Sequence, residues 1–437
     1  MELQAELAQT MGRVPGDLAR LSELIDPAWI EQALQTSGKA SIRRRKLPAE
    51  HVVWLVIGLA LFRNQPIWHV VKQLDLVLGD TPLCAPSASV QGRQRLGEEP
   101  LAQLFKQLTR AWSAPHAATR PELHGLALLA VDGVVWSAPD TPENRLALGS
   151  CANQHREGSW PQVRAVCLMD THSHELLDTQ LGAMTQGELT LATHLRVPDQ
   201  SLTVFDRAYF SAAFLLDWQT QGNARHWLMR AKDNMRHEVL GTHAPGDFNI
   251  RMPISLRARQ LRPELPLWWS ARLIEVELGG CIRRFITSLE DAQRYPAHVL
   301  AQLYRQRWEI ELGFREIKQS LQAGEFVLRS KQPALVRQEI WGILIAYTLL
   351  RRQMRLMAQR LKVSPLRMGF HVTSIAIIDV LRFAPLESAA TLPKRLALLF
   401  EQAHHFVLPP RREQRSFPRE VKYRAPKYAR KKCQSVS

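Results

Sequence analysis

Residues 126–136 read Leu-Ala-Leu-Leu-Ala-Val-Asp-Gly-Val-Val-Trp, an apolar run that only Asp132 and Gly133 interrupt. Such a run predicts a buried β-strand. A carboxylate inside it is costly to bury unless it has a partner. Asp132 is therefore either paired or opens onto a site, and the alternative of an Asp at a strand end or turn beside Gly133 stays open.

The segments that follow complete an α/β pattern. Strand-like stretches, a helix and a short buried strand that ends at Asp206 come in the order 163–169, 175–181, 187–195 and 202–205. Ligands of open α/β sheets gather near strand ends, so Asp206 is a second candidate. Its alternative role is to cap the next helix, although Ser211 is better placed for that. Two aspartates on neighbouring strands would repel each other unless a cation lies between them.

The flanks of this α/β part differ from it. Residues 1 to about 120 read as helical and contain the basic patch Arg43-Arg44-Arg45-Lys46. Their short helices with exposed Arg fit a DNA-reading module and a plain helical bundle equally well. The stretch from about 225 to 289 is strand-rich, helix returns at 296–321 and 335–362, and the tail beyond Pro409 is basic.

The overall charge points to a polyanionic partner. The chain has 57 Lys and Arg against 41 Asp and Glu, a net charge of +16. A membrane surface is the other anionic candidate, but no apolar run approaches the ~20 residues that a span needs. No signal peptide is visible, and the five cysteines are scattered without metal-type spacing. We therefore expect a cytoplasmic, nucleoid-associated protein without structural zinc.

A third acidic candidate comes from the helix at 296–321. At about 100° per residue, Arg307 lies at ~300° from Tyr304, Glu311 at ~340° and Lys318 at ~320°, so the four share an arc of roughly 60°. One acid thus stands among two cations and a tyrosine. A simple i, i+4 charge network, worth only ~0.2–0.5 kcal/mol, also explains Arg307 and Glu311. It explains less well why Tyr304 and Lys318 share their face.

The same helical wheel places an apolar stripe directly beside these four residues and two acids on the far side. The two acids are Glu309 and Glu316, near ~120–140°. The stripe consists of Leu303, Ile310, Phe314, Ile317 and Leu321. Three carboxylates at the margin of a core suit hard cations such as Mg²⁺, which prefer oxygen ligands and keep waters for substrate phosphates. Two such ions can serve an in-line phosphoryl displacement without a protein nucleophile.

These residues resemble the hallmarks of the DDE transposases of the insertion-sequence-4 family. That family has Tyr, two residues, Arg, three residues, Glu, six residues and Lys on its third-acid helix, which is the spacing of Tyr304, Arg307, Glu311 and Lys318. Asp132-Gly133 with residues 139–144 is similar to its first-aspartate region, and residues 206–211 to its second. Residues 46–70 are similar to its amino-terminal domain. The resemblance spans roughly residues 25 to 420.

The resemblance implies an α/β fold with an RNase H-like catalytic core at 121–345, interrupted by a β-rich insertion at about 225–289. A helical N-terminal DNA-binding domain would occupy 1–120, and a helical C-terminal region with a basic tail 346–437. It implies that the protein cuts DNA at the ends of its element and joins the 3′-hydroxyl ends to target DNA. The partners would be double-stranded DNA, as terminal inverted repeats and target, and a second copy of the chain in a homodimer; no membrane is expected.

The resemblance also assigns residues. Asp132, Asp206 and Glu311 would be the catalytic ligands of Mg²⁺ or Mn²⁺, and no other cofactor is expected. The DNA contacts would come from Tyr304, Arg307, Lys318, Arg230 and Lys232. Some relatives hold a flipped base with an insertion-domain Trp; Trp268 and Trp269 are candidates for that role here, with core packing as their alternative.

Three other functions compete with this interpretation. A domesticated or decayed relative would bind DNA without cutting it, which intact Asp132, Asp206 and Glu311 argue against. A simple metal-dependent nuclease would lack strand transfer. A tyrosine recombinase using Tyr304 would work without metal, so chelation would distinguish it.

Overall fold

The computed structural model describes residues 24–40, 47–74, 76, 85–112, 121–150, 160–278, 280–324, 327–383 and 391–410. The basic patch at 43–46 and the basic tail beyond residue 410 lie outside these ranges. In the part described, no helix is long and apolar enough to cross a membrane.

A single nine-stranded sheet runs through the molecule in the order β3-β2-β1-β4-β5-β9-β8-β7-β6. β1, β2 and β3 are antiparallel, whereas β1, β4 and β5 are parallel. The first four strands and the short helix before β4 confirm the α/β pattern read from the sequence. The strands are β1 (Ala127–Ser137), β2 (Gln162–Asp170), β3 (Leu176–Ala183), β4 (Ser201–Phe205), β5 (Arg225–Arg230), β6 (Glu238–Ala244), β7 (Asp247–Pro253), β8 (Trp268–Leu278) and β9 (Cys281–Thr287).

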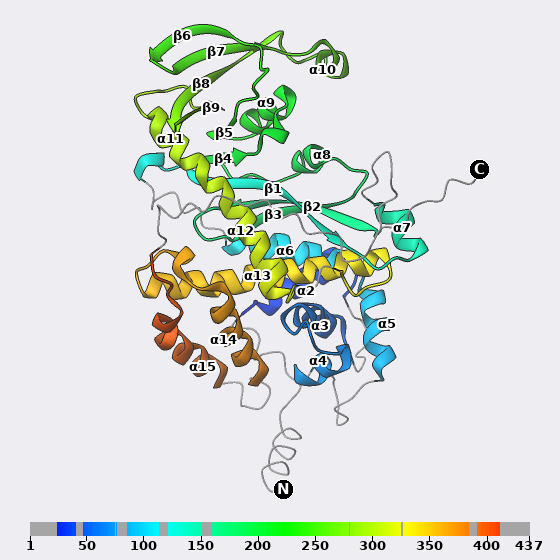
Figure 1. The fold of residues 1–437 in the computed structure, drawn as a ribbon. Coiled ribbons are helices and arrows are strands. Elements are labelled where there is room, and N and C mark those ends of the chain that lie inside the picture. Colours follow the sequence, from blue (N-terminus) through cyan, green and yellow to red (C-terminus); the bar gives the residue numbers. More distant parts are fainter. Residues whose placement is uncertain are drawn as a thin grey trace, which may run out of the picture.

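The β-rich insertion extends this sheet beyond β5, as the upper part of Figure 1 shows. The stretch expected as insertion, about 225–289, begins with β5. That strand pairs in parallel with β4 and therefore belongs to the first half of the sheet. The added strands are β6 to β9, all antiparallel, with the short helix α10 (Leu256–Leu261) between β7 and β8. Five strands in the order 3-2-1-4-5, followed by this extension, fit the RNase H-like core that the resemblance implies.

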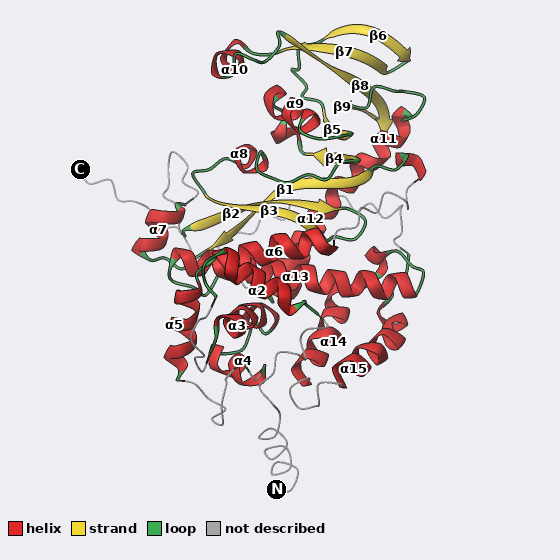
Figure 2. Cartoon of the chain, turned by 180° about the vertical axis from the view of Figure 1, so that it is seen from behind, coloured by secondary structure: helices red, strands yellow, loops and turns green. Residues whose placement is uncertain are grey.

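Helices cover both faces of the first half of the sheet (Figure 2). One face carries α8 (Glu188–Ala192) and α9 (Ala212–Thr220), and the other the long helix α13 (Pro333–Arg360). The remaining helices on that second side are α2 (Pro27–Thr36), α3 (Ala49–Leu61), α4 (Ile67–Gln73), α5 (Pro86–Leu96), α6 (Glu99–Trp112), α14 (Phe370–Phe383) and α15 (Thr391–Glu401). α7 (Pro142–Leu148) follows β1.

The N-terminal helices share one core with α13. Gly342 marks the closest approach: a Cβ there would lie 2.7 Å from Val56 Cγ1 and 2.9 Å from the Val56 carbonyl oxygen on α3. The domain boundary predicted at 345/346 falls inside α13, and that division stays a prediction. α13 is buried along most of its length, between α3, α6 and the sheet.

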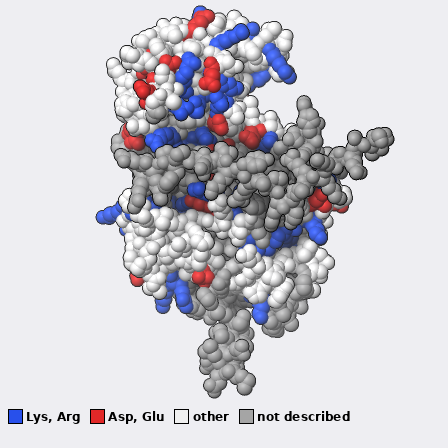
Figure 3. Space-filling view, viewed as in Figure 1, with Lys and Arg blue, Asp and Glu red and all other residues white. Residues whose placement is uncertain are grey.

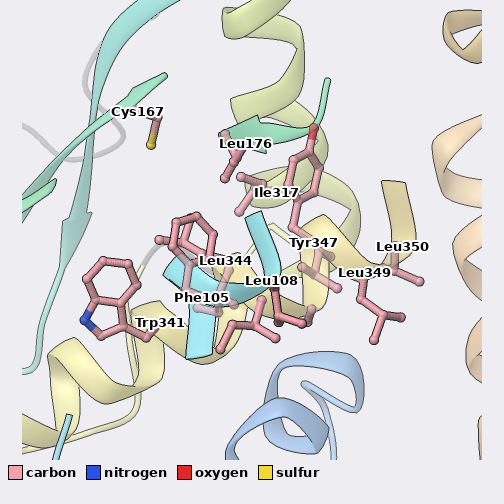
Figure 4. Packing of buried hydrophobic residues seen from close by; sticks show 14 of the residues in the cluster. Phe105, Leu108, Cys167, Leu176, Ile317, Trp341, Leu344, Tyr347, Leu349 and Leu350 are labelled. Atoms are coloured by element: carbon pink, nitrogen blue, oxygen red, sulfur yellow. The ribbon is translucent and has the colours of Figure 1, made fainter. Parts of the chain in front are cut away.

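The core between α6, α13 and the sheet combines aromatic and aliphatic side chains (Figure 4). Phe105 of α6 packs on Trp341 of α13, with ring centroids 5.4 Å apart. Ile317 and Leu176 join the same cluster from two other elements. The apolar stripe expected on helix 296–321 is buried, as predicted.

Candidate active site

The parallel pairing of β1 with β4 brings the two candidate aspartates together. Val131 lies opposite Phe205 at the end of that pairing, so Asp132 and Asp206 are the next positions along the two chains. Val131 and Phe205 belong to the apolar cluster on the α9 side. Because side chains alternate along a strand, the two aspartates emerge on the opposite face of the sheet.

Glu311 approaches that face from α12 (Trp308–Arg315). The guanidinium of Arg307, one turn earlier, joins the acids: its Nη2 donates to Glu311 Oε1 at 2.8 Å, and its Nη1 lies 3.6 Å from Asp132 Oδ2. Asp206 also interacts electrostatically with Arg307. The three acids predicted from sequences far apart in the chain therefore gather around one arginine, and the i, i+4 pair is only part of that arrangement.

Burial, together with neighbouring charges, sets the electrostatics of the site. Burial raises the pKa of Asp132 from 3.8 to about 6; the Gly133 amide and Arg307 oppose the shift, and the carboxylates of Glu311 and Glu188 add to it. Burial works against the charge of Arg307, yet the bond to Glu311 and the nearby Tyr304 and Asp206 leave the pKa of Arg307 raised. This site would gain from an additional cation.

The donor set suits a hard divalent ion. Within the described ranges, no three His, Cys, Asp or Glu side chains are already arranged as a metal-ion site, and Arg307 lies between Asp132 and Glu311. The available donors are nevertheless carboxylate oxygens, the ligand type that Mg²⁺ and Mn²⁺ prefer. Asp132 and Glu311 keep 21% and 33% of their side chains accessible, so a cation and a substrate phosphate can reach them.

Two of the expected DNA contacts border the acids directly. The Tyr304 phenol is partly buried, packs on Phe285 with ring centroids 5.2 Å apart, and interacts electrostatically with Arg307, Asp206 and Arg230. Burial is the main cause of its raised pKa. Tyr304 and Arg230, from helix and strand β5, are thereby placed beside Asp206.

The two expected lysine contacts lie to either side. Lys318 Nζ donates to the Val135 carbonyl at 3.0 Å, three residues beyond Asp132 on β1, and lies 6.0 Å from the Trp136 ring centroid. Lys232 Nζ lies 5.0 Å from the centroid of Phe210, in the loop that follows Asp206. The structure brings both lysines to the strands and loops that carry the aspartates.

The third-acid helix is not the regular α-helix assumed from the sequence. α11 (Ala297–Tyr304) is followed by a 3₁₀ turn (Arg305–Arg307), α12 and a π-helix (Glu316–Leu321). A constant 100° per residue therefore does not hold as far as Lys318, yet its ammonium still reaches β1, the strand that carries Asp132. π-turns often occur at functional sites.

The far-side acids of this helix form a buried ion network that sequence reasoning left without a role. His174 Nε2 lies 2.8 Å from Glu309 Oε2, and Glu316 accepts from Tyr347 at 2.9 Å and pairs with Arg351. Although burial opposes it, Arg351 and His174 lower the pKa of Glu316 to about 2. The network fixes the helix against α13 and the β2–β3 turn. The sequence signal that could have indicated this network is the pair of acids, Glu309 and Glu316, on the far side of the helix.

Two alternative roles raised by the sequence are resolved by geometry. Ser211, rather than Asp206, caps α9 by accepting from the Phe214 amide, and the Asp206 side chain makes no capping bond. Trp269 is buried against Trp227 and Phe210 in the core, whereas Trp268 is 38% exposed with the Arg251 guanidinium over its ring.

One arginine of the N-terminal helices has a structural role. Arg93 of α5 donates to Gln338 and Ser330, and so joins α5 to α13 instead of facing solvent freely. Arg95, two residues further along α5, is exposed.

Comparison with known proteins gives matches over nearly the whole chain. The model for the insertion element 4 transposase N-terminal region matches residues 15–106, and the model for the transposase DDE domain matches residues 124–349. Transposase InsG for insertion sequence element IS4 of Escherichia coli (strain K12) is 39% identical over 426 residues, which cover 96% of each chain. InsZ of the same strain is 34% identical over 247 residues, 54% of this chain and 81% of InsZ.

A solved structure resembles the chain more distantly. The piggyBac transposase synaptic complex with hairpin DNA, determined by cryo-EM, has a TM-score of 0.42 and 8% sequence identity, and the match covers 93% of this chain and 88% of that chain.

Proposed function

This chain belongs to the insertion element 4 family of DDE transposases, and on that premise we propose that it cuts DNA at the ends of its element and joins the 3′-hydroxyl ends to target DNA by two-metal phosphoryl transfer. The observation that carries the proposal is the convergence of Asp132, Asp206 and Glu311 around Arg307 at the end of the β1–β4 pair.

Asp132, Asp206 and Glu311 would hold the divalent cations, Mg²⁺ or Mn²⁺. When bound, such a pair of ions activates the attacking oxygen and stabilises the leaving oxygen of an in-line displacement. The raised pKa of Asp132 supports this assignment, because a carboxylate that ionises reluctantly beside two others gains most from a cation. Once cations neutralise the acids, the Arg307 guanidinium can donate to a phosphate oxygen of the DNA end.

The DNA contacts we propose are Tyr304, Arg307, Lys318, Arg230 and Lys232. Arg307, with its planar fork of donors, suits bidentate contact with a phosphate. Lys318 and Lys232 add point charges on the two sides of the aspartates. Figure 3 shows Lys and Arg side chains gathered over the insertion strands and in a band just below them, at the height of α11 and β4. A polyanion such as double-stranded DNA fits this surface.

Two ends of one element must be cut together for the element to move, so we propose a homodimer on paired terminal inverted repeats, with target DNA as the second DNA partner. We further propose that the protein works in the bacterial cytoplasm, associated with the nucleoid.

The decisive experiment compares Asp132→Ala, Asp206→Ala and Glu311→Ala with the unchanged chain, using DNA that carries the element's ends and Mg²⁺. We expect each variant to lose cleavage and to keep DNA binding in a mobility-shift assay. Glu122→Ala, an exposed acid before β1 at the other end of the strand, is the matched control and should cut normally.

The outcome separates the rival functions. Wild-type cleavage by any of the three variants would end the assignment of that acid. Cleavage without joining of the 3′ ends would indicate a nuclease, and binding without cleavage by the unchanged chain would indicate a DNA-binding relative. Cleavage that survives chelation would point to chemistry at Tyr304.

A further inference from the structure

Gly133, the residue after Asp132, has a carboxylate where its side chain would be. Its missing Cβ would lie 2.6 Å from the Cδ of Glu188 and 2.7 and 3.0 Å from its two carboxylate oxygens, far inside van der Waals contact. Glu188 is the first residue of α8, on the opposite side of the sheet from α12. The glycine therefore allows a fourth acid to come close to the strand backbone at Asp132.

Glu188 is only loosely neutralised in this position. Its nearest cation is Arg164 of β2, whose Nε lies 3.6 Å from Glu188 Oε1 and whose Nη1 donates to the Gln186 carbonyl. The carboxylate also acts electrostatically on Asp132 and on Tyr209. Glu188 thus adds to the negative charge that acts on Asp132.

Tyr209 provides an independent observation at the same place. Its side chain is only 2% exposed, yet its hydroxyl has no hydrogen-bond partner among the described residues. The charges that act on this phenol are Glu188 first, then Asp132, Cys167 and Asp206. A buried hydroxyl without a partner commonly marks an unfilled polar site.

We propose that Glu188 is a fourth carboxylate of the cation site, which strengthens divalent-metal binding at Asp132, and that Gly133 is required because it lets Glu188 approach. This inference rests on the proposed function. The Glu188 carboxylate acts through its charge, from the α8 side of the sheet, while Asp132, Asp206 and Glu311 remain the direct ligands.

The test measures cation binding apart from catalysis. Mn²⁺ is titrated calorimetrically into the full-length protein without DNA, and cleavage is then followed against Mg²⁺ concentration. Removing a supporting group beside a metal ligand usually weakens affinity about 10- to 100-fold, so we expect Glu188→Gln to weaken Mn²⁺ binding by at least about tenfold. The Mg²⁺ concentration that half-saturates cleavage by Glu188→Gln should rise by a similar factor. Glu122→Gln is the charge-matched control and should behave as the unchanged chain.

A double-mutant cycle separates charge from folding. Gly133→Ala displaces only the flexible end of Glu188, so the fold should persist while Mn²⁺ affinity falls as in Glu188→Gln. Because both changes remove the same carboxylate, the double variant should be no weaker than either single one. Additive losses, or unchanged Mn²⁺ affinity in Glu188→Gln, would overturn the proposal. If Asp132→Asn also bound Mn²⁺ normally, the metal site itself, and with it the proposed function, would be wrong.

Discussion

Replacing Asp132 by Asn should stabilise the metal-free protein at the same time as it abolishes cleavage. Burial and two neighbouring carboxylates raise the pKa of Asp132 from 3.8 to about 6, so the folded state holds this proton more tightly than the unfolded chain does. The ionised form therefore destabilises the fold above about pH 6, and this penalty disappears as the pH falls below the unfolded value. A shift of about two pKa units corresponds to about 3 kcal/mol.

The assay is urea unfolding in EDTA, followed by tryptophan fluorescence at several pH values. At about pH 8 we expect Asp132→Asn to be more stable by about 2–3 kcal/mol, since Asn keeps an acceptor for the Gly133 amide but loses the contact with Arg307. Near pH 4 the gain should fall below about 1 kcal/mol. Asp140→Asn is the control, and its change in stability should have the opposite sign, because the bond to Arg145 lowers the pKa of Asp140. A destabilised Asp132→Asn, or a gain that does not change with pH, would refute the electrostatic account.

Three further predictions follow from the charge and packing of the molecule. DNA binding should weaken by about 10³-fold or more between 50 and 200 mM salt if six or more phosphates are contacted, and a flat response in fluorescence anisotropy would exclude that surface. Arg272→Met should cost about 3–5 kcal/mol because it leaves Asp247 buried and unpaired, and the double change with Asp247→Leu should recover most of the loss in urea unfolding. Gly342→Ala should cost about 1–3 kcal/mol by forcing α13 off Val56 of α3, whereas Gly241→Ala, with open space around it, should be nearly neutral by the same measurement.

The sequence predicted the strands and the aspartates because both depend on local pattern. A continuous apolar run fixes β1 whatever surrounds it, and a charge within that run is costly enough to stand out at Asp132. The short strand before Asp206 is visible for the same reason. The spacing of Tyr304, Arg307 and Glu311 covers only about two helical turns, and the short 3₁₀ turn within it still leaves Arg307 in contact with Glu311.

What the sequence did not give depends on contacts between distant segments. β5 looks like any strand of the β-rich stretch, and only its pairing with β4 assigns it to the parallel part of the sheet. The π-helix that carries Lys318 begins at Glu316, which is bound to Arg351 and His174 from two other elements. Glu188 lies 56 positions after Asp132 in sequence, and no periodicity relates it to Gly133.

The direction of the pKa shift separates the candidate active site from the structural ion pairs of the same molecule. Glu316 and Glu339 are more deeply buried than Asp132, yet arginines hold the pKa of each below its ordinary value. Among the described carboxylates with shifted pKa, Asp132 is the one on which two other carboxylates act, and these come from elements on opposite faces of the sheet. Arg307 and Arg164 pair with Glu311 and Glu188, yet the pKa of Asp132 stays above its ordinary value. A cation bound at the proposed site would relieve this crowding, so the destabilised acid and the proposed metal chemistry would have the same physical cause.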